Sequence, residues 1–202
     1  EHELDQSLKD KIALFCNVPN SHVLQNLDVE YLYEAPLAME KENLAKVACE
    51  ALHLACPEPD LKDWEAMVDA LRHPNKEVKI ALVGKYIALH DAYISVVEAL
   101  KHGGIAEHAT VNIKWIDSEE LTPENADEYL GDVSGILVPG GFGSRGVEGK
   151  ILAAQYAREH KVPYLGLCLG MQVAIIEFAR HVCGFNDAHS VELDPNTTHP
   201  VI

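Results

Sequence analysis

The sequence lacks the residue spacings that would build a metal site or a disulfide framework. Its five cysteines are odd in number, and none forms a Cys-x-x-Cys pair. Its eleven histidines include no His-Glu-x-x-His motif. These absences argue against a zinc domain and against a disulfide-stapled secreted protein. We expect a reducing, cytoplasmic compartment and no metal bound by these residues.

The sequence also lacks long apolar runs and is poor in basic residues. Ile80–Val83 and Ile136–Val138 are strand-sized, far shorter than the roughly 20 apolar residues of a membrane-spanning helix. The 32 acidic residues outnumber the 16 basic ones, and the net charge of −16 gives a surface that repels polyanions. We therefore expect neither a membrane nor a nucleic acid as a partner.

The N-terminal third contains short apolar segments separated by turn residues. The apolar run Lys11–Cys16 precedes a cluster of turn residues and is predicted as a buried strand. Apolar residues at helical spacing predict a helix over residues 40–55 and a shorter one over Trp64–Leu71. Between these helices, Cys56-Pro-Glu-Pro-Asp60 is the best linker candidate.

From Glu77 onward, apolar strands alternate with helical patterns. The predicted strands are Val78–Val83, Thr110–Ile116, Gly135–Pro139 and Val162–Leu167, and the predicted helices are Asp91–His102, Pro123–Leu130, Val147–Glu159 and Gly170–His181. This alternation is typical of an α/β fold with a doubly wound, mostly parallel sheet and flanking helices. Ligands bind such sheets at the carboxyl ends of the strands, so the loops that follow the strands are the candidate site.

Gly166-Leu-Cys168-Leu-Gly170 is the most informative of these loops. The cysteine lies where a predicted strand passes into a predicted helix, between two glycines. This spacing is the thiol counterpart of the nucleophile elbow, in which a strained turn exposes the reactive side chain. A helix N-terminus there can stabilise a thiolate. Cys168 is therefore the candidate nucleophile.

Two glycine motifs resemble nucleotide-binding loops but depart from them. Gly141-Phe-Gly143-Ser-Arg-Gly146 matches the dinucleotide fingerprint, yet the next strand ends at Cys168 and not at the acid that would hold a ribose. Leu82-Val-Gly84-Lys85 lacks the first glycine and the final Ser or Thr of a phosphate-binding loop. The glycines after Pro139 better suit an oxyanion hole, because their backbone amides can approach a substrate carbonyl.

Val138-Pro-Gly-Gly-Phe-Gly143 and Gly166-Leu-Cys-Leu-Gly-Met-Gln172 together resemble the class I glutamine amidotransferases. Further segments resemble the CTP synthase family within that class: Lys11–Val18, Val83–Tyr86, Asp91–Tyr93, Glu98–Gly104, Val147–Gly149 and Ala179–Arg180. The resemblance implies a flavodoxin-like amidotransferase domain preceded by the end of a P-loop-type α/β synthetase domain. It places the synthetase part at residues 1–55, a linker at 56–76 and the amidotransferase part at 77–202.

The resemblance implies ATP-dependent amination of UTP to CTP, with ammonia released from glutamine at Cys168. It assigns the oxyanion amides to Gly140 and Leu169, glutamine binding to Phe142, Gln172 and Glu192, and nucleotide contacts to Lys11, Phe15, Asp28 and Val29. It also implies ATP and Mg²⁺ as cofactors of the full-length enzyme, CTP as a feedback ligand and a homo-oligomer, a dimer or tetramer.

A cysteine acyl transfer needs a base, and usually a group that orients it. His181 lies 13 residues beyond Cys168, roughly 20 Å along one helix, and His189 and His199 follow in a polar tail. The family's His and Glu partners are expected beyond Ile202, so we expect these 202 residues alone to be inactive. Two alternatives stay open, namely an amidotransferase for another acceptor and a non-catalytic regulatory or assembly module.

Overall fold

The computed structural model describes residues 2–55, 57–87 and 89–202. Its internal contacts divide the chain into two units, Glu1–His73 and Pro74–Ile202. Glu1 and Cys56, at the start of the predicted first domain and of the predicted linker, lie outside the described residues. The predicted boundaries at 55 and 77 stay a prediction.

In the described part of the N-terminal unit the regular elements are all helical. They are α1 Gln6–Cys16, η1 Asn20–His22, η2 Leu32–Glu34, α2 Ala35–Lys41, α3 Leu44–Ala51 and α4 Lys62–Arg72. The helix expected over Trp64–Leu71 is confirmed within α4. The single helix expected over 40–55 is wrong, because Asn43 takes a left-handed φ of 61° and separates α2 from α3.

The strand predicted over Lys11–Cys16 is also wrong, because these residues form the second half of α1. The Asp5 side chain accepts a hydrogen bond from the amide of Leu8 and begins the helix, and Asn17 ends it in the left-handed conformation. Such caps favour a helix. A short apolar run by itself does not distinguish a strand from a helix.

The C-terminal unit is built on a four-stranded parallel sheet of order β2-β1-β3-β4. Its strands are β1 Lys76–Gly84, β2 Ala109–Asp117, β3 Gly135–Val138 and β4 Tyr164–Gly166. All four strands expected from the sequence are present, with ends that differ by up to two residues. The predicted α/β fold with a parallel sheet is confirmed, and the strand order is that of flavodoxin-like sheets.

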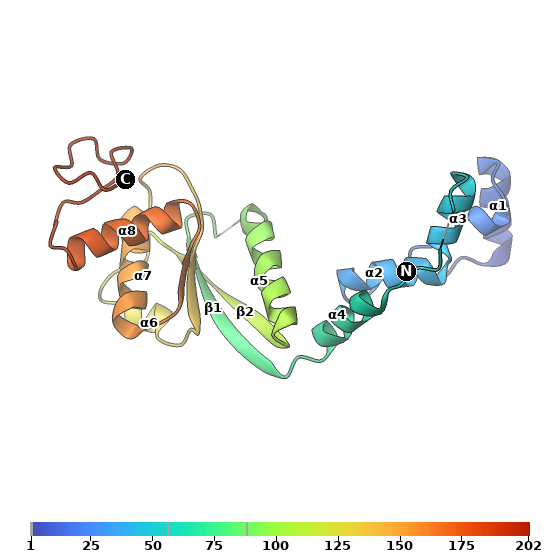
Figure 1. Cartoon of the computed structure of the whole chain (residues 1–202), viewed down its shortest axis with the longest axis horizontal. Coiled ribbons are helices and arrows are strands. Elements are labelled where there is room, and N and C mark those ends of the chain that lie inside the picture. The colour runs from blue at the N-terminus through green and yellow to red at the C-terminus, as the bar shows by residue number, and fades with distance from the viewer. Residues whose placement is uncertain (1, 56, 88) are drawn as a thin grey trace. The chain divides into compact units, whose positions relative to one another are not determined.

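Helices cover both faces of this sheet (Figure 1). η3 His90–Tyr93 and α5 Ile94–Ala106 lie on one face, and α6 Ala126–Leu130, α7 Val147–His160 and α8 Leu169–His181 lie on the other. Consecutive residues of β1 belong to different cores: Ala81 and Val83 pack with α7 and α8, whereas Leu82 packs with Tyr93. This alternation follows from the period of two along a strand.

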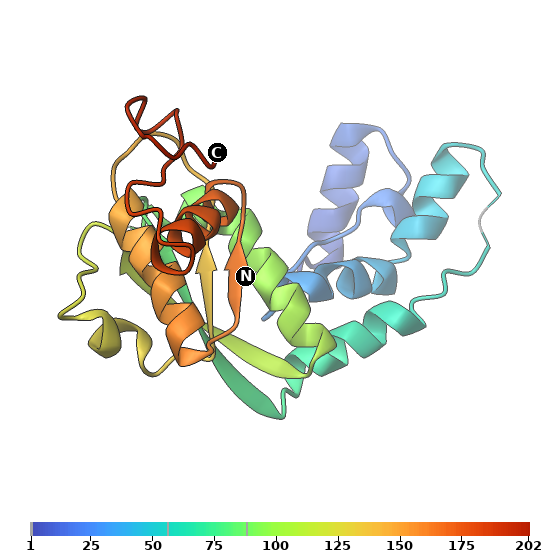
Figure 2. The same ribbon diagram turned by 60° about the vertical axis from the view of Figure 1, so that its left-hand side comes forward.

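The strand order reverses between β1 and β3, which pair Leu82 with Leu137. The carboxyl ends of these two strands therefore lie side by side, at the position where ligands bind in open α/β sheets. The segment after α8 contains an isolated bridge between His189 and Pro200. In both views this dark-red segment lies beside the loop that follows β3 (Figure 2).

Candidate functional site: a strained cysteine beside a glycine loop

The turn from β4 into α8 holds Cys168 in a strained conformation. Cys168 has φ 53° and ψ −107°, a region that non-glycine residues rarely occupy and that costs about 1–3 kcal/mol. Its thiol is free and exposed, and it is the N-cap residue of α8. This is the geometry of a nucleophile elbow.

Two glycines allow this turn to close. A Cβ on Gly166 would lie 2.4 Å from the carbonyl carbon of Gly170, and a Cβ on Gly170 would lie 2.0 Å from the carbonyl oxygen of Val138. Both distances are far inside van der Waals contact. The Leu167 amide also donates to the Val138 carbonyl at 2.9 Å, so the first turn of α8 is pressed against the end of β3.

Both residues with a predicted oxyanion role lie next to Cys168. Gly140 follows β3, and a Cβ built there would lie 3.5 Å from the Cys168 Cβ. Leu169 is buried and is the first residue of α8, where the amide has no acceptor within the helix. Two backbone amides beside one exposed thiol can stabilise the oxyanion of an acyl transfer. The assignment of that role stays a prediction.

The loop of residues 139–146 between β3 and α7, called the glycine loop, is held by a residue whose role the sequence did not reveal. The Lys85 ammonium, just after β1, donates to the Phe142 carbonyl, and Arg145 donates to the Lys85 carbonyl at 3.2 Å. The Phe142 side chain is 84% exposed, which leaves it free to contact a substrate. In the sequence, Lys85 belongs to an incomplete phosphate-binding motif and to the family-like segment Val83–Tyr86, and neither pattern indicates that it holds this loop. Its position directly after a strand that neighbours β3 was the available signal.

Lys150, in the first turns of α7, is fully buried beneath this loop. Its Nζ lies 3.7 Å from the Cβ position of Gly141 and has no hydrogen-bond partner among the described residues. Burial lowers the pKa of Lys150, and the charges of Lys85 and Arg145 lower it further. The amine therefore loses its proton more readily than an ordinary lysine.

Lys150→Met is expected to stabilise the protein by about 1–3 kcal/mol near neutral pH, because it removes a buried polar group without a partner. Because the pKa of Lys150 is lower in the folded protein than in the unfolded chain, the unfolded chain binds this proton more tightly. Wild-type stability should therefore rise with pH up to about 10.4, the ordinary lysine value, and the variant should lack this rise. Urea unfolding as a function of pH measures both effects. Identical pH slopes for the two proteins would contradict this account.

The remaining residues with predicted glutamine roles come from two segments. Gln172 is half-buried in the first turn of α8, and its backbone N–H donates to the Cys168 carbonyl at 3.2 Å. Glu192 is exposed in the segment after α8, and no contact recorded in the described chain joins it to Cys168 or Gln172. Its role, like that of Phe142 and Gln172, stays a prediction.

The segment that carries Glu192 is connected to α7 through Arg180 and Glu148. Arg180, on α8, donates to the Ala188 carbonyl at 2.8 Å and pairs with Glu148 at 2.9 Å. Glu148 lies in the first turn of α7, directly after the loop. The helix that follows Cys168, the helix that follows the loop and the Glu192 segment are therefore connected.

Each histidine that follows Cys168 interacts with an acid elsewhere. His181 lies 3.2 Å from Glu177, His189 lies 3.9 Å from Glu148, and His199 contacts Asp187. Within residues 2–55, 57–87 and 89–202, no histidine is recorded in contact with the Cys168 thiol. The described residues thus provide an exposed thiol and backbone amides beside it, but no positioned base.

The four residues with predicted nucleotide roles lie in the N-terminal unit. Lys11 and Phe15 are one helical turn apart on α1, and both are exposed, Phe15 by 87%. Asp28 is exposed, and Val29 lines a separate cavity of about 450 Å³ with Glu34 and Arg72 among its other residues. The recorded contacts do not bring the two pairs together, and their nucleotide roles stay predictions.

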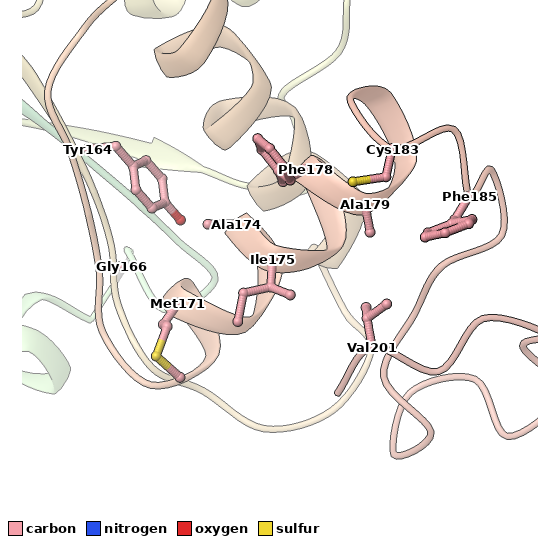
Figure 3. A pocket seen from close by; sticks show the side chains of 10 residues that line it. All are labelled: Tyr164, Gly166, Met171, Ala174, Ile175, Phe178, Ala179, Cys183, Phe185 and Val201. Atoms are coloured by element: carbon pink, nitrogen blue, oxygen red, sulfur yellow. The ribbon is translucent and has the colours of Figure 1, made fainter.

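A further cavity of about 580 Å³ lies beside α8 (Figure 3). Its lining is almost wholly apolar and includes neither Cys168 nor Gln172, so it is not a site for a polar amino acid. None of the helices in the described chain is long and apolar enough to cross a membrane. In the same residues, no group of three His, Cys, Asp or Glu side chains is arranged to hold a metal.

Comparison with protein families agrees with the geometry of the cysteine site. The family model described as glutamine amidotransferase class-I matches residues 88–200, and the model described as CTP synthase N-terminus matches residues 1–54. The two matches lie in different structural units. The amidotransferase match, over residues 88–200, contains the turn at Cys168 and the glycine loop.

Individual relatives extend the similarity to the whole chain. The chain is 57% identical to a CTP synthase of Clostridium kluyveri and 53% identical to one of Halalkalibacterium halodurans, in each case over 202 residues. Each match covers the whole of this chain, but the chain spans only 38% of the length of each relative. A solved structure of the Trypanosoma brucei CTPS glutaminase domain with bound acivicin is 50% identical, with a TM-score of 0.58, over 61% of this chain and 48% of that one.

Proposed function

This chain belongs to the class I glutamine amidotransferase family, and from that premise we propose that it carries the glutamine-cleaving cysteine of a CTP synthase. The observation that supports the proposal most is the strained, exposed Cys168 beside Gly140. A bound glutamine would present its carboxamide to the thiol, with its carbonyl oxygen toward the amides of Gly140 and Leu169.

In the proposed reaction the Cys168 sulfur attacks the carboxamide carbon of glutamine. The carbonyl oxygen becomes an oxyanion, which the two amides stabilise by hydrogen bonds. The amide nitrogen of the tetrahedral intermediate takes up the proton that the thiol lost and leaves as ammonia, and a thioester remains. Water hydrolyses the thioester, releases glutamate and restores the thiol.

The proton transfers in this cycle need a base that the described residues do not place at Cys168. We therefore expect the 202 residues alone to show no sustained glutamine hydrolysis. Steady ammonia release from glutamine by this chain, assayed by itself, would contradict that expectation.

We further propose that the ammonia serves the ATP-dependent amination of UTP to CTP. Similarity to CTP synthases over the entire chain supports this acceptor, together with the match of residues 1–54. ATP and Mg²⁺ as cofactors, CTP as a feedback ligand, a homotetramer and a cytoplasmic location belong to the same proposal.

Two other functions make different predictions. An amidotransferase for another acceptor would hydrolyse glutamine without forming CTP, and the similarity of residues 1–54 to CTP synthases argues against it. A non-catalytic module would leave Cys168 unreactive, although the exposed thiol favours reactivity. In the full-length protein, CTP formation from UTP, ATP and glutamine tests the first alternative. Labelling of Cys168 by a thiol-reactive glutamine analogue tests the second.

A further inference from the structure

The strain at Cys168 has to be balanced by contacts that fix the residues around it. One of them involves a side chain, because the Tyr164 hydroxyl donates to the Gly170 carbonyl at 2.7 Å. Tyr164 is the first residue of β4, and Gly170 is the second residue of α8. The bond therefore connects the strand before the elbow directly to the helix after it.

Figure 3 shows the Tyr164 ring beside α8, with its hydroxyl directed toward the helix. Gly170 is also the residue whose missing side chain lets α8 approach the Val138 carbonyl. Val138 ends β3, and Gly140 follows it by two residues. The position of Gly170 thus sets the position of the thiol relative to the glycine loop.

The Tyr164 hydroxyl keeps its proton at any working pH. Burial raises the pKa of Tyr164, and the nearby carboxylate of Glu177 raises it further. The Gly170 carbonyl can only accept, so the direction of the hydrogen bond does not change with pH.

We infer that Tyr164 is a positioning residue for Cys168, and that its hydrogen bond to Gly170 holds the strained turn in the geometry that aims the thiol past Gly140. This inference rests on the proposed function, because it assigns Tyr164 a part in glutamine hydrolysis. Tyr164 itself does not touch the reacting atoms.

The chain offers a matched control for the loss of this hydroxyl. Tyr156, on α7, donates to an Asp127 carboxylate oxygen at 2.8 Å and is buried in the same unit. Tyr164→Phe and Tyr156→Phe each remove one tyrosine hydrogen bond and leave the ring in place. Only the first of these bonds lies at the elbow, so the two variants separate positioning from general stability.

In the full-length protein, both variants should lower the melting temperature by a similar amount, about 2–4 °C. Tyr164→Phe should lower kcat for glutamine hydrolysis by about tenfold, because the loosened turn no longer holds the thiol in its reactive position. Its KM for glutamine and its ammonia-supported CTP synthesis should stay within about twofold of wild type. Tyr156→Phe should leave all three rates near wild type.

Equal kcat values for the two variants would overturn the inference, and so would a Tyr164→Phe protein that does not fold, because the hydroxyl would then serve the fold alone. Wild-type and Cys168→Ala proteins in the same assay separate this failure from that of the proposed function. If Cys168→Ala hydrolysed glutamine as wild type does, the proposed function would fail, and the inference would fail with it.

Discussion

Replacing Cys168 with alanine is expected to abolish glutamine-dependent CTP synthesis by the full-length protein and to spare synthesis from free ammonia. In the proposed reaction the thiol forms the covalent intermediate with glutamine, and the neighbouring residues of the turn, Leu167 and Leu169, have no nucleophilic side chain that could replace it. Loss of a covalent nucleophile typically lowers kcat by at least about 10³-fold. Free ammonia bypasses the thioester, so the amination of UTP should proceed at close to the wild-type rate. Parallel assays with glutamine and with ammonium chloride measure the two rates.

Cys183→Ala is the matched control, because Cys183 is also a free and exposed cysteine and lies just beyond the end of α8. It should leave both rates unchanged. Loss of both rates in a folded Cys168→Ala protein would contradict the prediction and would assign the cysteine to the synthetase chemistry. Unchanged glutamine-dependent synthesis would exclude Cys168 as the nucleophile.

Gly170→Ala should be the most disruptive single methyl addition at the elbow. The new Cβ would lie 2.0 Å from the Val138 carbonyl oxygen, so α8 would have to move away from β3. A clash with backbone in a packed core is expected to lower the free energy of unfolding by about 3 kcal/mol. Separation of the thiol from the Gly140 amide should also remove most of the glutamine-dependent activity. Urea unfolding and the glutamine assay measure the two effects.

Gly103→Ala provides the opposite case within the same unit. Gly103 lies inside α5, and a Cβ there would meet nothing within 4 Å. Alanine is the better helix former by about 1 kcal/mol, so this variant should be slightly more stable than wild type and fully active. Similar urea midpoints for Gly103→Ala and Gly170→Ala would show that α8 does not pack against β3 as described.

The order of elements in residues 74–202 could be predicted because its signals are local. Each strand is a short stretch of continuous or alternating apolar residues, and each stretch is followed by a loop and then by helical spacing. The site near Cys168 could be predicted for the same reason, since Gly166 and Gly170 mark a tight turn by their spacing alone. The strand predicted for residues 11–16 was wrong for a different reason. The caps at Asp5 and Asn17 favour a helix there, although the apolar run itself is compatible with a strand.

By itself the sequence determined the tight turn at Cys168, the glycine loop and the parallel α/β pattern, because each depends on neighbours within a few residues. Only the tertiary structure decided that Gly140 lies against Cys168, that Lys85 holds the Phe142 carbonyl and that Lys150 is buried without a partner. The first two of these contacts join residues that are 28 and 57 positions apart in the sequence. They exist because parallel pairing places the ends of β1, β3 and β4 at one edge of the sheet, an arrangement that no local sequence pattern encodes.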